Sequence, residues 1–218
     1  MLHLRVANKL GITEKKLKNI KSIIFDLGGV IIDIRFQETI NQFKRFGFND
    51  FDDIYNQIKQ TRLFDLLETG KIPPQAFRNE LRKYKNQLTD EQIDYAWNFM
   101  IGDMPKSHIA LLKKLRSHYQ TFLLSNTNAI HVDYFEHYLE QTFGYNPLPD
   151  MFEQTYYSFE IGERKPDTKI FEYVMTKACL NAEETLFIDD TEANIKGAQK
   201  VGLLAYHLEN EPISDLFE

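Results

Sequence analysis

Short runs of apolar residues alternate with stretches of helical spacing from residue 22 onward. Uninterrupted apolar strands that are separated by helices are typical of a parallel sheet that helices cover on both faces. The third run is less apolar than the others, which favours a position nearer to an edge of the sheet. The predicted strands span residues 22–25, 121–124, 155–159, 185–188 and 203–207.

The segments between these strands carry apolar residues at the spacing of one helical face. Asp167 stands where its side chain can cap the helix that follows it, and residues 193–202 are expected to form a helix that closes at a glycine. The apolar faces contain Ile109, Leu112 and Leu115 in one helix, and Ile170, Phe171, Val174 and Met175 in another. The sequence therefore predicts an α/β protein with a Rossmann-like, parallel five-stranded sheet and helices on both faces.

The stretch from residue 35 to residue 105 contains no convincing strand. Thr89 and Gln92 have the spacing of a capping box at the start of a helix. Helical stripes are formed by Ile40, Phe43 and Phe46, by Phe77, Leu81 and Tyr84, and by Ile93, Ala96, Trp97 and Met100. We expect residues 35–105 to form an all-α domain, inserted into a core domain made of residues 21–34 and 106–218. Residues 1–20 are an N-terminal extension to which the sequence assigns no role.

The composition is ordinary for a globular protein, with 43% hydrophobic and 27% charged residues in a chain of 218. The formal net charge of -6 argues against the basic surface of a nucleic-acid-binding protein. No apolar run approaches the length of a transmembrane helix, and the first residues lack the features of a secretory signal. We expect a cytoplasmic protein that binds neither nucleic acid nor membranes, and no obligate protein partner can be read from the sequence.

Cysteine and histidine offer no metal site. Cys179 is the only cysteine, which rules out a disulfide within the chain and a cysteine-based zinc site. It lies in an apolar helical pattern and is expected to be a small core residue. His131 and His137 are spaced so that they would not share a helical face well, so we expect surface or partly packed side chains and no zinc pair.

Polar residues stand at the ends of several predicted strands. Asp26 ends the first, Ser125 and Asn126 end the second, and Asp189 and Asp190 end the fourth, while Lys165 lies in the loop after the third. Open parallel sheets bind ligands outside the carboxyl ends of their strands. Three carboxylates, a hydroxyl and an ammonium are therefore expected to converge on one rim.

This set of side chains favours phosphate chemistry. Clustered carboxylates repel one another, and a divalent cation such as Mg²⁺, which prefers oxygen ligands, would compensate their charge. The cation and Lys165 could neutralise a transferring phosphoryl group, and a carboxylate could act as the nucleophile. Ser125 Oγ and the backbone N–H that follows it could hold phosphate oxygens.

Each of these residues also has a purely structural interpretation. Asp26 followed by two glycines could form a turn, and the pair Asp189 and Asp190 could begin a solvated helix. Lys165 could be an extended residue before a helix that starts with proline, and Ser125 could be a helix cap. The shared position at strand ends, in this order along the chain, is what favours the functional interpretation.

Four segments, in order, resemble the motifs of the haloacid dehalogenase-like hydrolases. They are IIFDLGGVIID, FLLSNTN, GERKPD and LFIDDTEANIKGA, and the resemblance covers about residues 20 to 208. Four motifs in the right order are far more specific than one. By this resemblance, the helical insert corresponds to the C1 cap of the family, which closes over the rim and selects the substrate.

The resemblance implies a role for each carboxylate. Asp26 would be the covalent nucleophile and a ligand of Mg²⁺, the carbonyl group of Gly28 a second ligand, and Asp190 the third. Asp189 would lie near the metal or its waters. Mg²⁺ is thus the cofactor that the resemblance implies.

The resemblance also implies which residues bind the substrate. Ser125 and Asn126 would bind the phosphoryl group. Lys165 would pair both with Asp26 and with the transferring phosphate, as a catalytic and a substrate-binding residue.

One position departs from the pattern of most phosphatases in the family, which have a second Asp two positions after the nucleophile. That Asp protonates the leaving group and later activates water, whereas Gly28 can supply only a carbonyl group. The local sequence is most similar to a bacterial branch that includes α-D-glucose-1-phosphatases and that also lacks the second Asp. The general acid is therefore left unassigned, and a metal-held water, the Asp33 side chain or another group could substitute in activating water.

The resemblance implies a magnesium-dependent phosphatase that hydrolyses a small phosphomonoester, a sugar phosphate, through an aspartyl-phosphate. The partner would be a small phosphorylated metabolite. Two alternatives stay open: a 2-haloacid dehalogenase, which needs no metal, and a catalytically silent binding protein on the same fold. The pair Asp189 and Asp190 argues against the dehalogenase, whose fourth motif lacks it.

Overall fold

The computed structural model describes residues 17–51, 53, 55–56, 61–85, 87–209 and 211–217. Five parallel strands form one sheet in the order β3-β2-β1-β4-β5. Their bounds are Ser22–Phe25 for β1, Gln120–Ser125 for β2, Gln154–Tyr157 for β3, Thr185–Asp189 for β4 and Leu204–His207 for β5. The predicted fold class is confirmed, as is the position of the least apolar strand at an edge.

The third strand is shorter than predicted at its carboxyl end. Its pairing with β2 stops where Ser125 faces Tyr157, and the chain turns directly into α11 (Ser158–Ile161). Ser158 is fully buried, and its hydroxyl donates to the carbonyl of Thr127 and accepts from the N–H of the same residue. These hydrogen bonds draw the chain out of the sheet.

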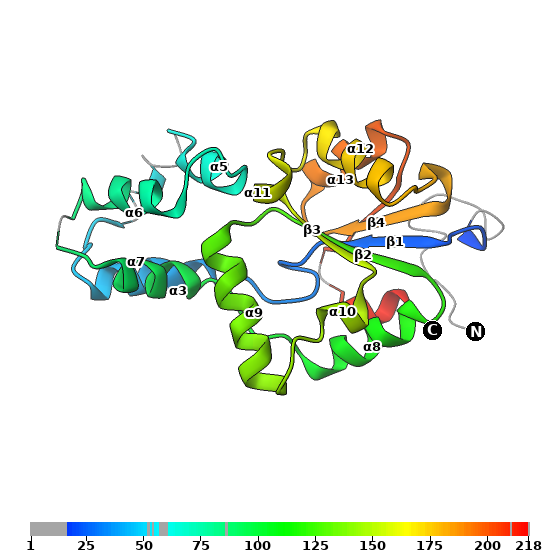
Figure 1. Cartoon of the computed structure of the whole chain (residues 1–218), viewed down its shortest axis with the longest axis horizontal. Helices are drawn as coiled ribbons and strands as arrows, with labels where there is room; N and C mark the ends of the chain where they lie inside the picture. Colours follow the sequence, from blue (N-terminus) through cyan, green and yellow to red (C-terminus); the bar gives the residue numbers. More distant parts are fainter. Residues whose placement is uncertain are drawn as a thin grey trace.

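Alternate residues of the central strand β1 face opposite layers of the molecule, as the period of a β-strand requires. Ile23 and Phe25 pack into one apolar cluster, and Ile24 packs into the other. The first cluster is covered by α8 (Lys106–Arg116), α9 (Ala129–Phe143), α10 (Leu148–Met151) and η2 (Ile213–Leu216). The second is covered by α12 (Thr168–Lys177) and α13 (Glu192–Lys200), with η1 (Ala182–Glu184) leading into β4. Figure 1 shows α12 and α13 on one side of the sheet and α8 and α10 on the other.

The residues between β1 and α8 form helices around a third apolar cluster, which Ile130 of α9 joins from outside the segment. The capping box of Thr89 and Gln92 is present, with each side chain bonded to the other's backbone. Tyr84 departs from its predicted stripe, because its side chain is exposed. The helices are α3 (Phe36–Arg45), α5 (Leu63–Glu68), α6 (Pro74–Arg82) and α7 (Asp90–Asn98).

Two extended crossings connect this helical segment with the sheet, and they pair with each other. Ile34 and Ile101 form an isolated antiparallel bridge, and the N–H of Gly102 donates to the carbonyl of Asp33 at 2.9 Å. A Cβ atom at residue 102 would lie only 2.5 Å from that carbonyl oxygen, so the close approach requires glycine. The connection is therefore narrow and hydrogen-bonded.

Two side chains differ from their predicted environments. Cys179 is exposed, because α12 ends at Lys177 and residue 179 adopts a φ of 53° just beyond the helix. His131 is buried rather than at the surface, because α9 turns it towards the helical segment.

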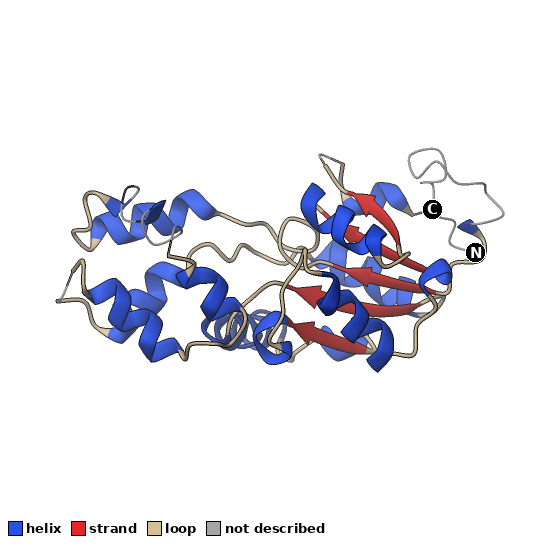
Figure 2. Cartoon of the chain, turned by 90° about the horizontal axis from the view of Figure 1, so that it is seen from above, coloured by secondary structure: helices blue, strands red, loops and turns tan. Residues whose placement is uncertain are grey.

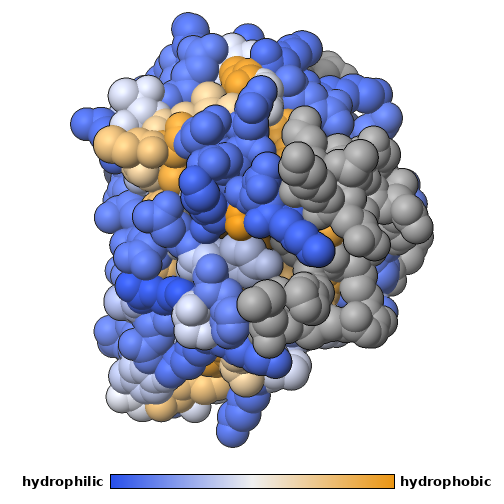
Figure 3. All heavy atoms as spheres, turned by 90° about the vertical axis from the view of Figure 1, so that its right-hand side faces the viewer, coloured by the Kyte–Doolittle hydropathy of each residue, from blue (hydrophilic) through white to orange (hydrophobic). Residues whose placement is uncertain are grey.

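The described part of the chain contains no helix that is both long and apolar enough to cross a bilayer. Figure 3 views the end of the molecule opposite the helical segment. The residues that it colours by hydropathy are mainly hydrophilic, with small scattered apolar patches. Residues 1–16 of the predicted N-terminal extension lie outside the described residues, whereas Leu17 and Ile20 belong to the core.

Candidate active site

The carboxyl ends of the strands face the helical segment, as the arrows in Figure 2 show. A cavity of about 470 Å³ lies between them. It is lined by every residue for which the sequence predicted a site role in catalysis, substrate binding or metal binding, namely Asp26, Gly28, Ser125, Asn126, Lys165 and Asp190. The alignment of parallel strands explains this convergence, because their carboxyl ends share one edge of the sheet.

Asp26 follows directly on β1 and is almost completely buried, with 8% exposure. Its Oδ1 accepts a hydrogen bond of 2.7 Å from the N–H of Leu27 and lies 2.8 Å from Lys165 Nζ. Burial, together with the charge of Asp189, raises the pKa of the Asp26 carboxyl to about 7, although Lys165 acts in the opposite direction. A second positive charge near this carboxylate would therefore favour its ionised form.

Lys165 places a buried ammonium at the centre of the site, where its side chain is 1% exposed. Besides Asp26, Nζ contacts Asp189 Oδ2 at 2.6 Å and the carbonyl of Leu124 at 2.9 Å. Burial alone would lower the pKa of this ammonium, but the two carboxylates raise it above its ordinary value. The side chain is therefore held as a charged group.

Asp189 ends β4 and is completely buried. Its carboxylate accepts from Lys165 Nζ, from the backbone N–H of Thr191 at 2.8 Å, and from Asn194 Nδ2 at 3.0 and 3.1 Å. Asp189 is not among the described residues that line the cavity. The contacts show a fixed counter-charge that orients the lysine.

The three carboxylates nevertheless form one cluster. Asp26, Asp189 and Asp190 each offer an oxygen atom, and these atoms lie within 4.8 Å of one another. Asp190 is the exposed member, and burial, followed by the charge of Asp189, raises its pKa. Such a cluster gains from a bound cation.

Gly29 is what allows Asp190 to approach the loop after β1. It has a φ of 75°, and a Cβ atom there would lie 2.1 Å from Asp190 Oδ2. Any side chain at this position would strain the backbone and displace the carboxylate. The sequence alone indicated only a turn at this glycine.

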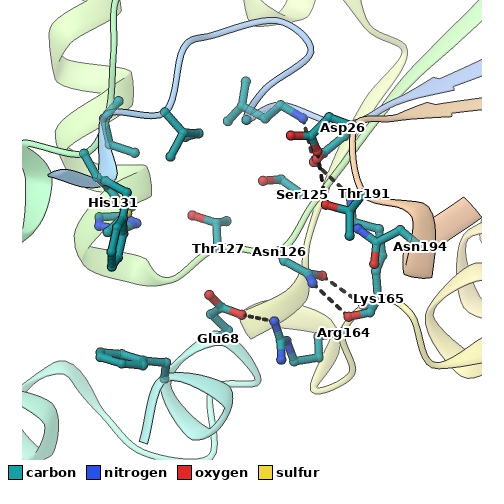
Figure 4. Close-up of a pocket in the computed structure, with 18 of the residues that line it drawn as sticks. Asp26, Glu68, Ser125, Asn126, Thr127, His131, Arg164, Lys165, Thr191 and Asn194 are labelled. Atoms are coloured by element: carbon teal, nitrogen blue, oxygen red, sulfur yellow. Dashed lines mark hydrogen bonds and ion pairs between the residues drawn. The ribbon is translucent and has the colours of Figure 1, made fainter. Parts of the chain in front are cut away.

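Ser125 and Asn126 lie side by side at the end of β2 but differ in their contacts. Ser125 lines the cavity (Figure 4), where it can contact a ligand. The Asn126 side chain is occupied: Nδ2 donates to the carbonyl of Lys165, and Oδ1 accepts from the N–H of Lys165, both at 2.9 Å. Asn126 thus fixes the loop that carries Lys165, which leaves its backbone N–H as the group that can meet a phosphoryl oxygen.

Gly28 lies beside Ile34, a residue of the first crossing. A Cβ atom on residue 28 would lie 2.9 Å from both Cδ1 and Cγ1 of Ile34. The isoleucine therefore occupies the space into which a side chain at residue 28 would project. Asp33, which could have replaced the missing acid in activating water, is exposed and is not among the described residues that line the cavity, so its position argues against that role.

Aromatic rings from the helical segment form the wall opposite the strand ends. Tyr55 stacks on Phe64 with centroids 4.8 Å apart, Phe64 on Trp97 at 5.2 Å, and Trp97 on His131 of α9 at 5.1 Å. His131 Nε2 also lies 3.2 Å from the carbonyl of Trp97. Burial lowers the pKa of His131 to about 4, so the ring is neutral at physiological pH and packs as an aromatic side chain.

Ion pairs join the two parts of the molecule on another side of the cavity. Arg164, which precedes Lys165, pairs with Asp65 and, through Nη2 at 2.9 Å, with Glu68 Oε2, both from α5. Close by, a Cβ atom on Gly70 would lie 2.3 Å from the carbonyl of Phe159. The helical segment is therefore in close contact with the loop that carries Lys165.

A model of the haloacid dehalogenase-like hydrolases matches residues 20–202. The chain belongs to this family. It is 32% identical over 192 residues to a D-ribitol-5-phosphate phosphatase of Bacteroides thetaiotaomicron. That alignment covers 88% of this chain and 93% of the phosphatase. It is 27% identical over 193 residues to a sesquiterpene phosphatase of Aspergillus oryzae. That alignment covers 86% of this chain and 89% of the relative.

A solved structure agrees with this membership. A HAD family enzyme of Bacteroides thetaiotaomicron in complex with magnesium and inorganic phosphate superimposes with a TM-score of 0.82 at 38% identity. The match covers 91% of this chain and all of that one. An L-2-haloacid dehalogenase of Xanthobacter autotrophicus shares the fold at a TM-score of 0.59 and 17% identity.

In this member of the family, sequence reasoning gave no role to several residues that the structure places in or beside the site. Asn194 follows Asp189 by five positions and reaches back to it from the first turn of α13, which its spacing could have indicated. Arg164, Trp97 and His131 gave no such signal, since their partners lie far away along the chain.

Proposed function

We propose that this hydrolase is a magnesium-dependent phosphatase that cleaves a small phosphomonoester, a sugar phosphate, through an aspartyl-phosphate on Asp26. The observation that carries the proposal is the cluster of Asp26, Asp189 and Asp190 at the strand ends, where Lys165 contacts the first two beside the cavity. The phosphatase activities named for two relatives, and the magnesium and phosphate in a similar solved structure, support it.

The residues present fit Mg²⁺. All available donors are oxygen atoms, and two carboxylates with pKa values above their ordinary range lie close together. Asp26, Asp190 and the carbonyl group of Gly28 would hold the ion, since Asp189 is already engaged by Lys165, Thr191 and Asn194. When bound, Mg²⁺ supplies positive charge that stabilises the transferring phosphoryl group.

The protein's own residues then account for two displacement steps. A carboxylate oxygen of Asp26 attacks phosphorus, the bond from phosphorus to the ester oxygen breaks, and the substituent leaves as an alkoxide that takes a proton from solvent water. Lys165, the Ser125 hydroxyl and the backbone N–H of Asn126 balance and orient the phosphoryl oxygens. Water then attacks phosphorus, which releases inorganic phosphate and restores the Asp26 carboxylate.

The helical segment serves this chemistry as a cap. Its residues line the cavity together with the strand ends, as Glu68 and Trp97 illustrate. A domain formed by residues 35–105 that opens about the paired crossings at Ile34 and Ile101 would admit substrate and then exclude water. This domain division agrees with the apolar cluster that forms mostly inside the segment.

Removal of the metal is the direct test. Chelation with EDTA is expected to abolish hydrolysis of 4-nitrophenyl phosphate, and added Mg²⁺ is expected to restore it. Asp190→Ala should lower kcat/KM by at least about 10²-fold, because it removes a metal ligand. Asp33→Asn, at an exposed carboxylate outside the cavity, is the matched control and should retain wild-type activity. Full hydrolysis of 4-nitrophenyl phosphate in EDTA would refute the metal-dependent mechanism. Turnover of a 2-haloacid in EDTA, without phosphatase activity, would instead favour a metal-independent dehalogenase.

Because residue 28 carries no acidic side chain, we expect the rate of hydrolysis to depend strongly on the leaving group. A positioned general acid contributes roughly 10²–10⁴-fold to a proton-transfer step, and residue 28 cannot supply one. Wild-type rates should therefore rise steeply with leaving-group acidity, and sugar 1-phosphates should react faster than the corresponding 6-phosphates. Gly28→Asp combined with Ile34→Ala, which clears the space beside residue 28, should flatten this dependence.

The single variant Ile34→Ala controls for the cleared space and should keep the steep dependence. The measurement is kcat/KM over a series of aryl and alkyl phosphates, with the chemical step shown to limit the rate. A flat series for the wild type would mean that another residue donates the proton.

A further inference from the structure

Three residues that line the cavity each carry a buried polar atom to which the described residues give no hydrogen bond. Glu68 Oε2, Arg164 Nε and Trp97 Nε1 are all buried, and no described group completes a hydrogen bond with any of them. All three residues line the cavity that contains Asp26. Because buried polar groups without hydrogen bonds cost free energy, a concentration of such groups in the residues around one cavity points to a ligand that satisfies them.

Glu68 and Arg164 contact each other without satisfying these atoms. Glu68 Oε2 and Arg164 Nη2 are 2.9 Å apart, the distance of an ion pair, but the angles do not form a hydrogen bond. The carboxylate therefore keeps acceptor capacity, and the guanidinium keeps a donor at Nε. The pair therefore combines a hydrogen-bond acceptor with a hydrogen-bond donor, and a hydroxyl group can bond to both.

These residues lie at the end of the cavity that a leaving group would occupy. Figure 4 shows Glu68 and Arg164 away from Asp26, with Ser125, Asn126 and Thr127 in the region between them. A phosphoryl group held at Asp26 would thus project its ester substituent towards Glu68. The indole of Trp97, 4% exposed, contributes a donor on the same aromatic wall.

We propose that Glu68, Arg164 and Trp97 form a subsite that binds hydroxyl groups of the leaving alcohol. The site then selects polyhydroxylated esters, such as sugar or alditol phosphates, over phosphates of hydrocarbon alcohols. This rests on the proposed phosphatase function. A hydrocarbon would contact the aromatic rings but would leave Glu68 Oε2, Arg164 Nε and Trp97 Nε1 without a hydrogen bond, and such mismatches discriminate strongly between substrates.

The experiment compares kcat/KM of the full-length, magnesium-loaded enzyme for ribitol 5-phosphate, geranyl phosphate and 4-nitrophenyl phosphate. The wild type should prefer ribitol 5-phosphate to geranyl phosphate by about 10-fold or more. Glu68→Gln should lower kcat/KM for the ribitol ester by roughly 10- to 100-fold, and for the aryl ester much less. Trp97→Phe, which keeps an aromatic ring but removes the N–H, should act in the same direction.

Asp65→Asn is the matched control. Asp65 also pairs with Arg164 across the same contact, but it is not among the described residues that line the cavity with Asp26. This variant should leave the ratio between ribitol and geranyl esters unchanged, because it weakens the contact without altering the subsite. The aryl ester reports whether each variant is folded and active.

Two results would overturn the inference while leaving the phosphatase function intact. One is a wild type that prefers geranyl phosphate. The other is a Glu68→Gln variant that loses activity equally on all three esters, which would reduce Glu68 to a contact that closes the cap. Absence of turnover with every phosphate ester would instead refute the proposed function itself, and the subsite with it.

Discussion

Asp26→Asn is expected to abolish turnover and to leave the protein folded. The amide keeps the shape of the side chain but cannot attack phosphorus, so kcat should fall by about 10⁴-fold or more, as when other catalytic nucleophiles are removed. Lys165 keeps its contacts with Asp189 and with the carbonyl of Leu124, so the centre of the site retains its hydrogen bonds. Activity and a thermal unfolding curve measure the two effects.

The same substitution has a predictable effect on stability without metal. The folded-state pKa of Asp26 is raised from 3.8 to about 7, so ionised Asp26 opposes folding fully above pH 7, and this penalty decreases as pH falls from 7 towards 3.8. In EDTA at pH 8 the variant should therefore have a Tm equal to or above that of the wild type. At pH 5 the difference should shrink.

Asp33→Asn again serves as the control, since it removes an exposed carboxylate near the same loop. A crystal of the wild type with beryllofluoride should show the mimic on Asp26. Residual activity of Asp26→Asn within tenfold of the wild type, or a mimic bound elsewhere with Asp26 untouched, would contradict the assignment of the nucleophile.

The convergence of the site could be predicted because it depends on local rules. Apolar runs identified the strands, and a parallel arrangement places their carboxyl ends on one edge. Asp26, Ser125 and Asp190 follow such runs directly, so their positions along the chain were sufficient to bring them into one cavity. The capping residues Asp167 and Thr89 were recognisable for the same reason, since their partners lie within three residues.

Contacts across long chain separations could not be predicted in this way. Arg164 and Asp65 are 99 residues apart, and Trp97 and His131 are 34 apart. They meet only because the helical segment packs over the strand ends, and no periodic pattern encodes that packing. His131 was accordingly misjudged as a surface or partly packed side chain. The sequence suggested Asn126 as a phosphate ligand, but its side chain proves to be bonded to the backbone of Lys165.

Lys165→Met is expected to damage both stability and activity, because this ammonium is the one described cation that contacts both Asp26 and Asp189. Methionine fills a similar volume but leaves two buried carboxylates without their partner. Removing one member of a buried ion pair costs about 3–5 kcal/mol, so the free energy of unfolding should fall by roughly that amount at neutral pH. Turnover should fall by at least about 10³-fold, since charge on the transferring phosphoryl group loses its compensation.

The pH dependence distinguishes an electrostatic loss from a packing defect. Without Lys165 the pKa of Asp26 rises further, so its ionised form opposes folding at high pH, and this penalty disappears as pH falls and the carboxyl is protonated. The difference in Tm between the wild type and Lys165→Met, measured in EDTA, should therefore be larger at pH 8 than at pH 5. A packing defect would give the same difference at both.

Lys169→Met is the matched control, because it removes an exposed lysine whose Nζ lies 3.6 Å from Glu163 Oε1. Exposed pairs of this kind contribute only about 0–1 kcal/mol, so its unfolding curve should overlie that of the wild type. In the Lys165→Met background, Asp189→Asn should recover part of the stability by removing one uncompensated charge, but none of the activity. A Lys165→Met protein as stable as the wild type at pH 8 would show that the lysine does not compensate these carboxylates.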